Sequence, residues 1–157
     1  MLYLIGLGLG NERSLSLNGL EAIKKCEKVF LECYTSKINC DVSDLEKLTG
    51  KNIIRVNRNI VEEELDVKDA RGENIALLII GDVFSATTHI SLFKDCTDKD
   101  VEVRIINNAS ILTAVGITGL ELYKFGKVAS IPFENENVVA PIKILEDNQK
   151  INYVFHE

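Results

Sequence analysis

The feature that most constrains the fold is an unbroken apolar run, IALLII, at residues 75–80. A strand with one face in water alternates apolar and polar residues, whereas a strand covered on both faces reads as a continuous apolar run. Strand-like runs of this kind recur along the chain at Leu2–Ile5, Val29–Leu31, Ile53–Val56, Ile75–Ile80 and Val101–Ile106. The sequence therefore predicts a parallel sheet that lies between layers of helices.

Segments with helical character separate these runs. Leu17, Leu20 and Ile23 keep a spacing of three, and Asn18 followed by Glu21 is a candidate capping box. The other predicted helices are Val42–Leu48, Ile60–Ala70, Thr87–Cys96 and Ala109–Tyr123. Alternating strands and helices predict an α/β fold, with an open, mostly parallel sheet flanked by helices and right-handed crossovers.

The pattern changes after Gly126, which is well placed to stop the last of these helices. The remaining predicted elements are a strand at Val128–Phe133, a helix at Pro141–Lys150 and a strand at Tyr153–Phe155. We expect residues 1–126 to form a cofactor-binding α/β domain. Residues 127–157 would be the incomplete beginning of a second α/β domain.

Composition restricts the class of partner. The chain has 24 Asp and Glu residues against 18 Lys and Arg, which argues against nucleic acid because phosphate binding needs a basic surface. No apolar run approaches the roughly 20 residues of a membrane helix, and no basic segment precedes the apolar N-terminus as in a signal peptide. The four cysteines form no CxxC pair. We therefore expect a cytoplasmic protein with reduced thiols and no metal site.

Three segments with unusual residues follow predicted strands directly: GLGLG at 6–10, GDVFSATTH at 81–89 and NNASI at 107–111. Ligands of open parallel sheets bind where the carboxyl ends of the strands meet, so we expect the three segments to line one cleft. The carboxylate of Asp82 can bind a ribose hydroxyl pair or an ammonium group. Exposed amides at the start of the helix after Asn107 can bind a carboxylate. This combination suits a small zwitterionic nucleoside.

Each feature also has a plainer interpretation. GLGLG differs from the dinucleotide fingerprint GxGxxG because its third glycine comes one residue early. Glu32, at the end of the second strand, leaves a nicotinamide-binding site as one alternative. The other is that the glycines only permit a tight turn and close packing. Gly116 and Gly119 fall inside a predicted helix, where close packing would offset their helical cost. His89 is either a general base or an inert, hydrogen-bonded histidine at a helix start.

Five blocks of the sequence, taken in order, carry a resemblance. They read MLYLIGLGLG at 1–10, LECYTS at 31–36, GDVFSATTH at 81–89, NNASILTAVG at 107–116 and GLELYKFG at 119–126. These blocks resemble the signature segments of diphthine synthases, the methyltransferases of diphthamide biosynthesis in the tetrapyrrole methylase class. The resemblance spans residues 1–133 and thins afterwards.

The resemblance implies S-adenosylmethionine as cofactor, with S-adenosylhomocysteine as product, and the modified histidine of translation elongation factor 2 as substrate. Methyl groups would pass to the amino group of its 3-amino-3-carboxypropyl side chain. Members of the family are typically two-domain homodimers. The cofactor contacts carried over by position are Leu9, Asp82, Ser85, Ser110 and Ile111. No catalytic residue is identified.

The sequence also departs from the family pattern. Val83 and Ser85 replace a proline and a glycine, and Asn107 stands where histidine is common. Relatives run on into a complete second domain. Two alternatives follow: a cofactor-binding or dimerising remnant without turnover, and a related methylase acting on a small tetrapyrrole. The tetrapyrrole alternative calls for a basic cleft because its substrates are poly-acids, and the sequence offers few basic candidates.

Overall fold

The computed structural model describes residues 1–61, 70–85, 88–131 and 138–153. The chain divides into two compact units, Met1–Ala114 and Val115–Glu157. The sequence places the end of the cofactor-binding domain at residue 126, whereas the first compact unit ends at Ala114. Each unit is described by itself below.

A five-stranded sheet forms the centre of the first unit, in the order β3-β2-β4-β1-β5. The strands are β1 (Leu2–Gly6), β2 (Lys28–Glu32), β3 (Ile54–Val56), β4 (Ile75–Ile79) and β5 (Val103–Ile106). Every pairing between them is parallel. The predicted open parallel sheet is therefore confirmed, with strand bounds within two residues of those expected.

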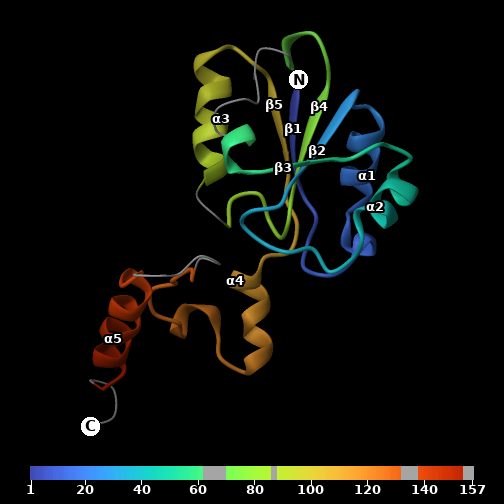
Figure 1. Cartoon of the computed structure of the whole chain (residues 1–157). Helices are drawn as coiled ribbons and strands as arrows, with labels where there is room; N and C mark the ends of the chain where they lie inside the picture. The colour runs from blue at the N-terminus through green and yellow to red at the C-terminus, as the bar shows by residue number, and fades with distance from the viewer. Residues whose placement is uncertain (62–69, 86–87, 132–137, 154–157) are drawn as a thin grey trace. The chain divides into compact units, whose positions relative to one another are not determined.

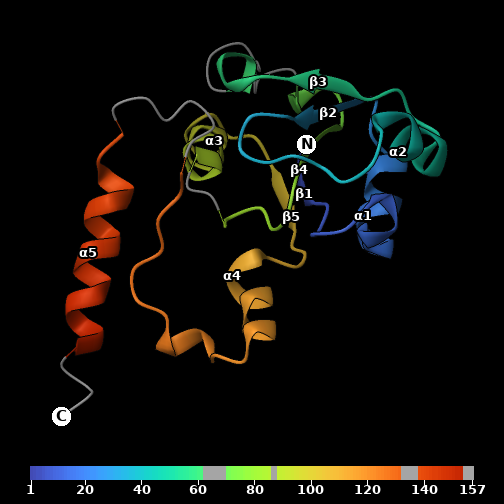
Figure 2. The same ribbon diagram turned by 60° about the horizontal axis from the view of Figure 1, so that its bottom comes forward.

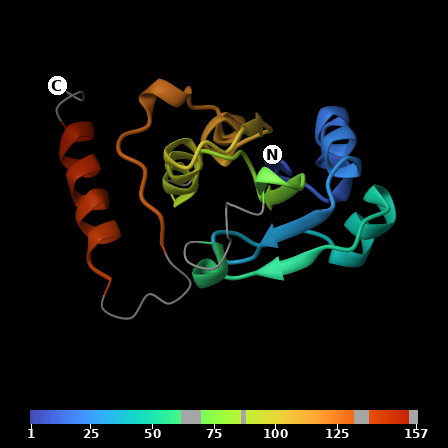
Figure 3. The ribbon, with the colours of Figure 1, turned by 90° about the horizontal axis from the view of Figure 1, so that it is seen from above.

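Helices cover both faces of this sheet. The helices α1 (Leu17–Lys24) and α2 (Val42–Thr49) lie against one face, and α3 (Thr88–Asp98) lies against the other (Figures 1 and 3). Side chains of β1 alternate between the two layers. Leu2 and Leu4 pack in the core on the α3 side, whereas Tyr3 and Ile5 pack in the core under α1 and α2. This double burial explains why the strands read as continuous apolar runs.

The cap of α1 differs from the expected one. Ser16 is the N-cap, and its hydroxyl accepts a hydrogen bond from the Gly19 amide at 3.1 Å. The predicted box from Asn18 to Glu21 is wrong because Leu17 is the first residue of the helix, with its side chain in water. Serine is a better cap here because its short side chain reaches the orphan amides of the first turn.

The long helix predicted at 109–123 does not form. The structure has a short α4 (Ile111–Ala114) and then 3₁₀ turns at Val115–Thr118 and Leu122–Lys124. Gly119 takes φ +91°, a conformation that interrupts a right-handed helix. The packing explanation for Gly116 and Gly119 is wrong within the described structure, because a Cβ at either position would meet no atom within 4 Å.

The second unit contains α5 (Ala140–Tyr153), which confirms the predicted helix at 141–150. Residues 128–131 form no strand, and the rest of the strand predicted at 128–133 lies outside the described residues. Tyr153 ends α5, so the last predicted strand does not begin there; its remaining residues also lie outside the described ones. Most of the 60–70 segment and Thr87 are likewise outside them. Across the described ranges, no helix has both the length and the apolar character that crossing a membrane requires.

Candidate functional site at the carboxyl ends of the strands

The loops after β1 and β4 meet directly. The Gly8 amide donates to the Gly81 carbonyl at 3.0 Å, and the Gly81 amide donates back to the Gly8 carbonyl at 2.9 Å. The Leu7 amide also donates to the Ile79 carbonyl at 2.8 Å. The parallel sheet thus ends in a small antiparallel bridge between two loops that are more than seventy residues apart in sequence. Figure 2 turns this edge of the sheet towards the viewer.

The loop after β5 joins the first loop through Asn108. Its side-chain amide nitrogen donates to the Gly6 carbonyl at 2.9 Å and to the Ser14 carbonyl at 3.0 Å. Its side-chain oxygen accepts from the Ala109 amide at 2.8 Å. One asparagine therefore satisfies the last carbonyl of β1 and a carbonyl of the 3₁₀ turn Glu12–Ser14. It also holds its own loop in place.

Asp82 joins the second loop to the third. One carboxylate oxygen accepts the Asn108 amide at 3.0 Å, and the other accepts the Phe84 amide at 3.1 Å. The carboxylate is half-buried and each oxygen has a further lone pair. The expectation that three remote segments meet at one rim is confirmed. Asp82 builds that rim, whereas its contact with a cofactor stays a prediction.

Glycine is required at this rim by close packing. A Cβ on Gly6 would lie 2.7 Å from the Gly81 carbonyl oxygen and 2.9 Å from the Asn108 Cβ. Gly8 takes φ +78°, which L-residues with side chains rarely adopt. The plainer interpretation of GLGLG therefore accounts for Gly6 and Gly8. Both permit the loops to approach each other closely.

Two serines link the second and third loops again. The Ser85 hydroxyl donates to the Ser110 hydroxyl oxygen at 2.6 Å, and that oxygen accepts the Leu112 amide at 3.1 Å. The Ser110 carbonyl accepts the amides of Thr113 and Ala114. These three amides at the helix start are thus satisfied within the chain. Binding of a ligand carboxylate at the helix start would therefore need the amides of Ser110 or Ile111, and it stays a prediction.

The apolar residues of the predicted site lie at the surface. The side chain of Leu9 is 41% exposed and that of Ile111 is 63% exposed, so both can contact a ligand. The five predicted cofactor contacts, from Leu9 to Ile111, thus all lie on the three linked loops. Which of them touch a ligand stays a prediction.

Glu32 does not take the role considered from the sequence. His89 lies at a helix start as its plainer interpretation expects, but its ring nitrogens have no hydrogen-bond partner among the described residues. Both side chains are 0% exposed, and they face each other with 3.7 Å between His89 Nε2 and Glu32 Oε2. A nicotinamide site that uses Glu32 to hold a ribose is therefore wrong. His89 cannot reach a substrate in this structure. Sequence reasoning missed the pair, although the alternation in β2 that turns Phe30 and Glu32 towards α3 could have indicated it.

The thiols show no sign of a nucleophile. Burial raises the pKa of Cys26 to about 11 and that of Cys96 to about 11. Burial also raises the pKa of Cys33, although that side chain is exposed at the end of β2. The described residues contain no cluster of histidine, cysteine and acidic side chains that could hold a metal ion.

An open polar hollow of about 560 Å³ lies beside the glycine loop. Its lining includes Glu12, which follows that loop, and Asp41 and Asp44 at the start of α2. No lysine or arginine belongs to the lining. Such a surface repels a poly-acid.

Comparison with known proteins agrees with this architecture. The model of the tetrapyrrole (corrin/porphyrin) methylase family matches residues 1–146. The diphthine methyl ester synthase of Schizosaccharomyces pombe is 45% identical over 139 residues, which cover 87% of this chain and 49% of that protein. The human diphthine methyl ester synthase is 45% identical over 135 residues, which cover 85% of this chain and 47% of that protein.

A solved structure of a diphthine synthase superposes on the chain with a TM-score of 0.88 at 35% identity. The match covers 96% of this chain and 60% of that one. The chain thus spans about half the length of the curated relatives that it matches. The family match and the parallel sheet with its linked loops lead to one conclusion: the chain belongs to the tetrapyrrole methylase family, in which it is similar to the diphthine synthases.

Proposed function

We propose that this chain binds S-adenosylmethionine at the carboxyl rim of the sheet and acts as a diphthine synthase. It would methylate the amino group of the modified histidine of elongation factor 2. The observation that carries the proposal is the meeting of three remote loops, which brings Leu9, Asp82 and Ile111 to one edge. The names of the relatives support the choice of reaction.

The residues at the rim fit such a cofactor chemically. Asp82 offers a half-exposed carboxylate with free lone pairs, which suits ribose hydroxyls or the cationic groups of the ligand. Leu9 and Ile111 offer exposed apolar surface, which suits an adenine ring. Gly10 leaves main chain exposed next to Leu9, so a ligand can approach it closely.

The cofactor would supply an electrophilic methyl group on a sulfonium, so the task of the protein is mainly to align and to exclude water. Asp82 and Asn108 hold the three loops in a fixed geometry before any ligand arrives. The attacking amine must be neutral. His89 is fully buried and does not serve as its base, and we assign no general base to the chain.

The proposal includes the partners that the resemblance implies. Elongation factor 2 would be the protein substrate, a second copy of the chain would complete a homodimer, and both would meet in the cytoplasm. These partners rest on the likeness to diphthine synthases and not on any surface described above.

Two alternatives compete with this function. A small-molecule methylase for tetrapyrroles needs a basic cleft, and the acids that line the hollow beside the glycine loop disfavour it. A cofactor-binding remnant without turnover would share the same rim and differs from the synthase only in the transfer step.

Two measurements separate these possibilities. Calorimetric titration with S-adenosylhomocysteine tests the site, and we expect saturable binding with a stoichiometry of one per chain. Incubation with labelled S-adenosylmethionine and unmethylated elongation factor 2 tests turnover. Binding with label transfer supports the synthase, and binding without transfer supports the remnant. Absence of binding contradicts the proposal.

A further inference from the structure

The side chains of Glu32 and His89 are buried in the first unit, on the side of the sheet that α3 covers. Glu32 is the last residue of β2, and His89 is the second residue of α3. We propose that they form a positioning pair, which fixes the Asp82–Ser85 loop and so sets cofactor affinity without touching the cofactor. The effect on affinity rests on the proposed function, whereas the effect on the loop does not.

The polar atoms of the pair depend on each other. Thr35 donates its hydroxyl hydrogen to Glu32 Oε1. Glu32 Oε2 and both ring nitrogens of His89 have no hydrogen-bond partner within the part of the chain that the structure describes. The separation of 3.7 Å between Nε2 and Oε2 is within ion-pair range but longer than a hydrogen bond. Removing one member would leave the other buried without compensation, which is strongly destabilising.

The location of the pair connects it to the rim. His89 comes four residues after Ser85 in the sequence, so the place of His89 limits where the Asp82–Ser85 loop can end. Glu32 is held in the sheet, because β2 pairs with both β3 and β4. The pair therefore ties the start of α3 to the sheet. The Asp82–Ser85 loop is fixed at one end by β4 and at the other by this contact.

The experiment compares three variants with the wild type: Glu32→Leu, His89→Leu and the double variant. Each single variant leaves the other polar side chain buried opposite an apolar one, whereas the double variant places two apolar side chains at these positions. Glu46→Leu is the matched control. Glu46 in α2 accepts the Ile53 amide at 2.8 Å from a part-buried position, and α2 covers the other face of the sheet.

Two readouts are taken at a temperature well below unfolding. Hydrogen exchange at the Phe84, Ser85 and Asn108 amides reports the order of the loop, since each donates to Asp82. Calorimetry gives the Kd of S-adenosylhomocysteine. We expect each single variant to raise exchange and Kd by about tenfold, the double variant to recover most of both, and the control to match the wild type.

Each outcome decides between the two claims. Faster exchange in Glu32→Leu with no binding even by the wild type supports the positioning pair and contradicts the proposed function. Wild-type exchange in both single variants contradicts the pair, whatever the cofactor does. Additive losses in the double variant also overturn it, because they would make the two residues independent. Lower stability with unchanged exchange and Kd would assign them an ordinary core role.

Discussion

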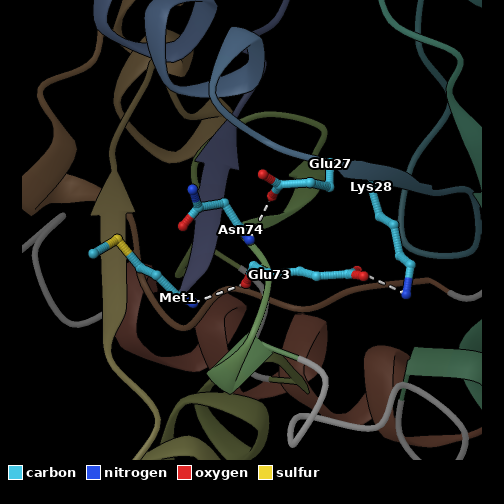
Figure 4. Close-up of polar contacts among 5 residues, drawn as sticks. All are labelled: Met1, Glu27, Lys28, Glu73 and Asn74. Atoms are coloured by element: carbon cyan, nitrogen blue, oxygen red, sulfur yellow. Dashed lines mark hydrogen bonds and ion pairs between the residues drawn. The ribbon is translucent and has the colours of Figure 1, made fainter.

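The two edges of the parallel sheet are built in different ways. At the carboxyl edge, Asp82 and Asn108 join loops that are remote in sequence, and Leu9 and Ile111 stay exposed beside them. At the amino edge, shown in Figure 4, hydrogen bonds and an ion pair link residues at or just before the beginnings of strands. Both edges use hydrogen bonds between side chain and backbone, but at the carboxyl edge these bonds join three loops with a partly buried carboxylate between them.

Polar groups at the amino edge bond one another. The Met1 ammonium donates to the Glu73 carbonyl at 3.0 Å, Glu27 accepts the Asn74 amide at 2.6 Å, and Lys28 pairs with Glu73 at 2.9 Å (Figure 4). Parallel α/β sheets bind ligands at the opposite edge, where chains leave the strands for the helices. Under the proposed function, the comparison teaches that the amino edge serves stability and the carboxyl edge serves recognition. Substitutions at each edge should therefore change different quantities.

The largest effect is expected from Gly6→Ala at the carboxyl edge. Its new Cβ would lie 2.7 Å from the Gly81 carbonyl oxygen and must push the two loops apart. We expect a loss of roughly 1–3 kcal/mol in the free energy of unfolding, from overpacking. We also expect S-adenosylhomocysteine affinity to fall by about 100-fold, or about 2.7 kcal/mol.

Denaturant titration and calorimetry measure the two quantities. Gly72→Ala, in the loop before β4, is the control because a Cβ there would meet no atom within 4 Å. Wild-type affinity in Gly6→Ala would show that the meeting of these loops does not shape the site.

Asn108→Ala should have the next largest effect. The substitution leaves the Gly6 and Ser14 carbonyls without their side-chain donor, at a cost of about 1–3 kcal/mol in stability. Affinity for S-adenosylhomocysteine should fall by about tenfold. Asn74→Ala is the counterpart at the amino edge, where the side chain donates to the Lys25 carbonyl at 3.2 Å. It should lower stability by about 1 kcal/mol and leave affinity unchanged. Equal effects of both variants on affinity would contradict the division between the edges.

Alkaline pH should lower the free energy of unfolding through a buried thiol near the amino edge of the sheet. Burial raises the pKa of Cys26 from 9.0 to about 11, so the unfolded chain loses this proton first. The contribution of this thiol to the free energy of unfolding is complete below pH 9 and is lost as the pH rises towards 11. Between about pH 8 and about pH 10.5, the free energy of unfolding should fall by about 1–2 kcal/mol more in the wild type than in Cys26→Ala. Parallel pH profiles for the two proteins would contradict this expectation.

Lys28→Met should have the smallest effect. The ion pair with Glu73 has both side chains close to half exposed, so solvent screens it. We expect a change of less than about 1 kcal/mol in the free energy of unfolding, smaller still at high salt, and no change in affinity. Chemical denaturation at two salt concentrations checks the first part. A loss of affinity would show that the amino edge contributes to ligand binding, which would contradict the division between the two edges.

The sheet was predictable because its strands leave a signal in consecutive residues of the sequence. Double burial requires continuous apolar runs, and the runs at 2–5 and 75–80 therefore located β1 and β4 closely. The stretch 109–123 was not predictable in this way. Its apolar residues keep a helical spacing, but Ser110 ties the first turn to the neighbouring loop and Gly119 takes a positive φ. Tertiary contacts and one backbone conformation prevailed over helical periodicity there.

The location of the site was predictable from the sequence, but its hydrogen bonds and side-chain contacts were not. The rule that loops meet at the carboxyl ends of parallel strands brought the three segments together correctly. No pattern in the sequence indicated that Asn108 would donate to Gly6 and Ser14, because the contact joins distant residues. Alternation in β2 gives the face of the sheet on which Glu32 lies, but not His89 as its neighbour. Side-chain partners of this kind depend on strand order, which residue spacing does not determine.

The most direct test of the central claim is a calorimetric titration of S-adenosylhomocysteine into the wild type and Asp82→Ala. The account predicts saturable binding by the wild type and an affinity lower by about 1–3 kcal/mol in the variant, because Asp82 both joins the loops and presents a carboxylate to the ligand. The same affinity in both proteins, or no binding by the wild type, would contradict it.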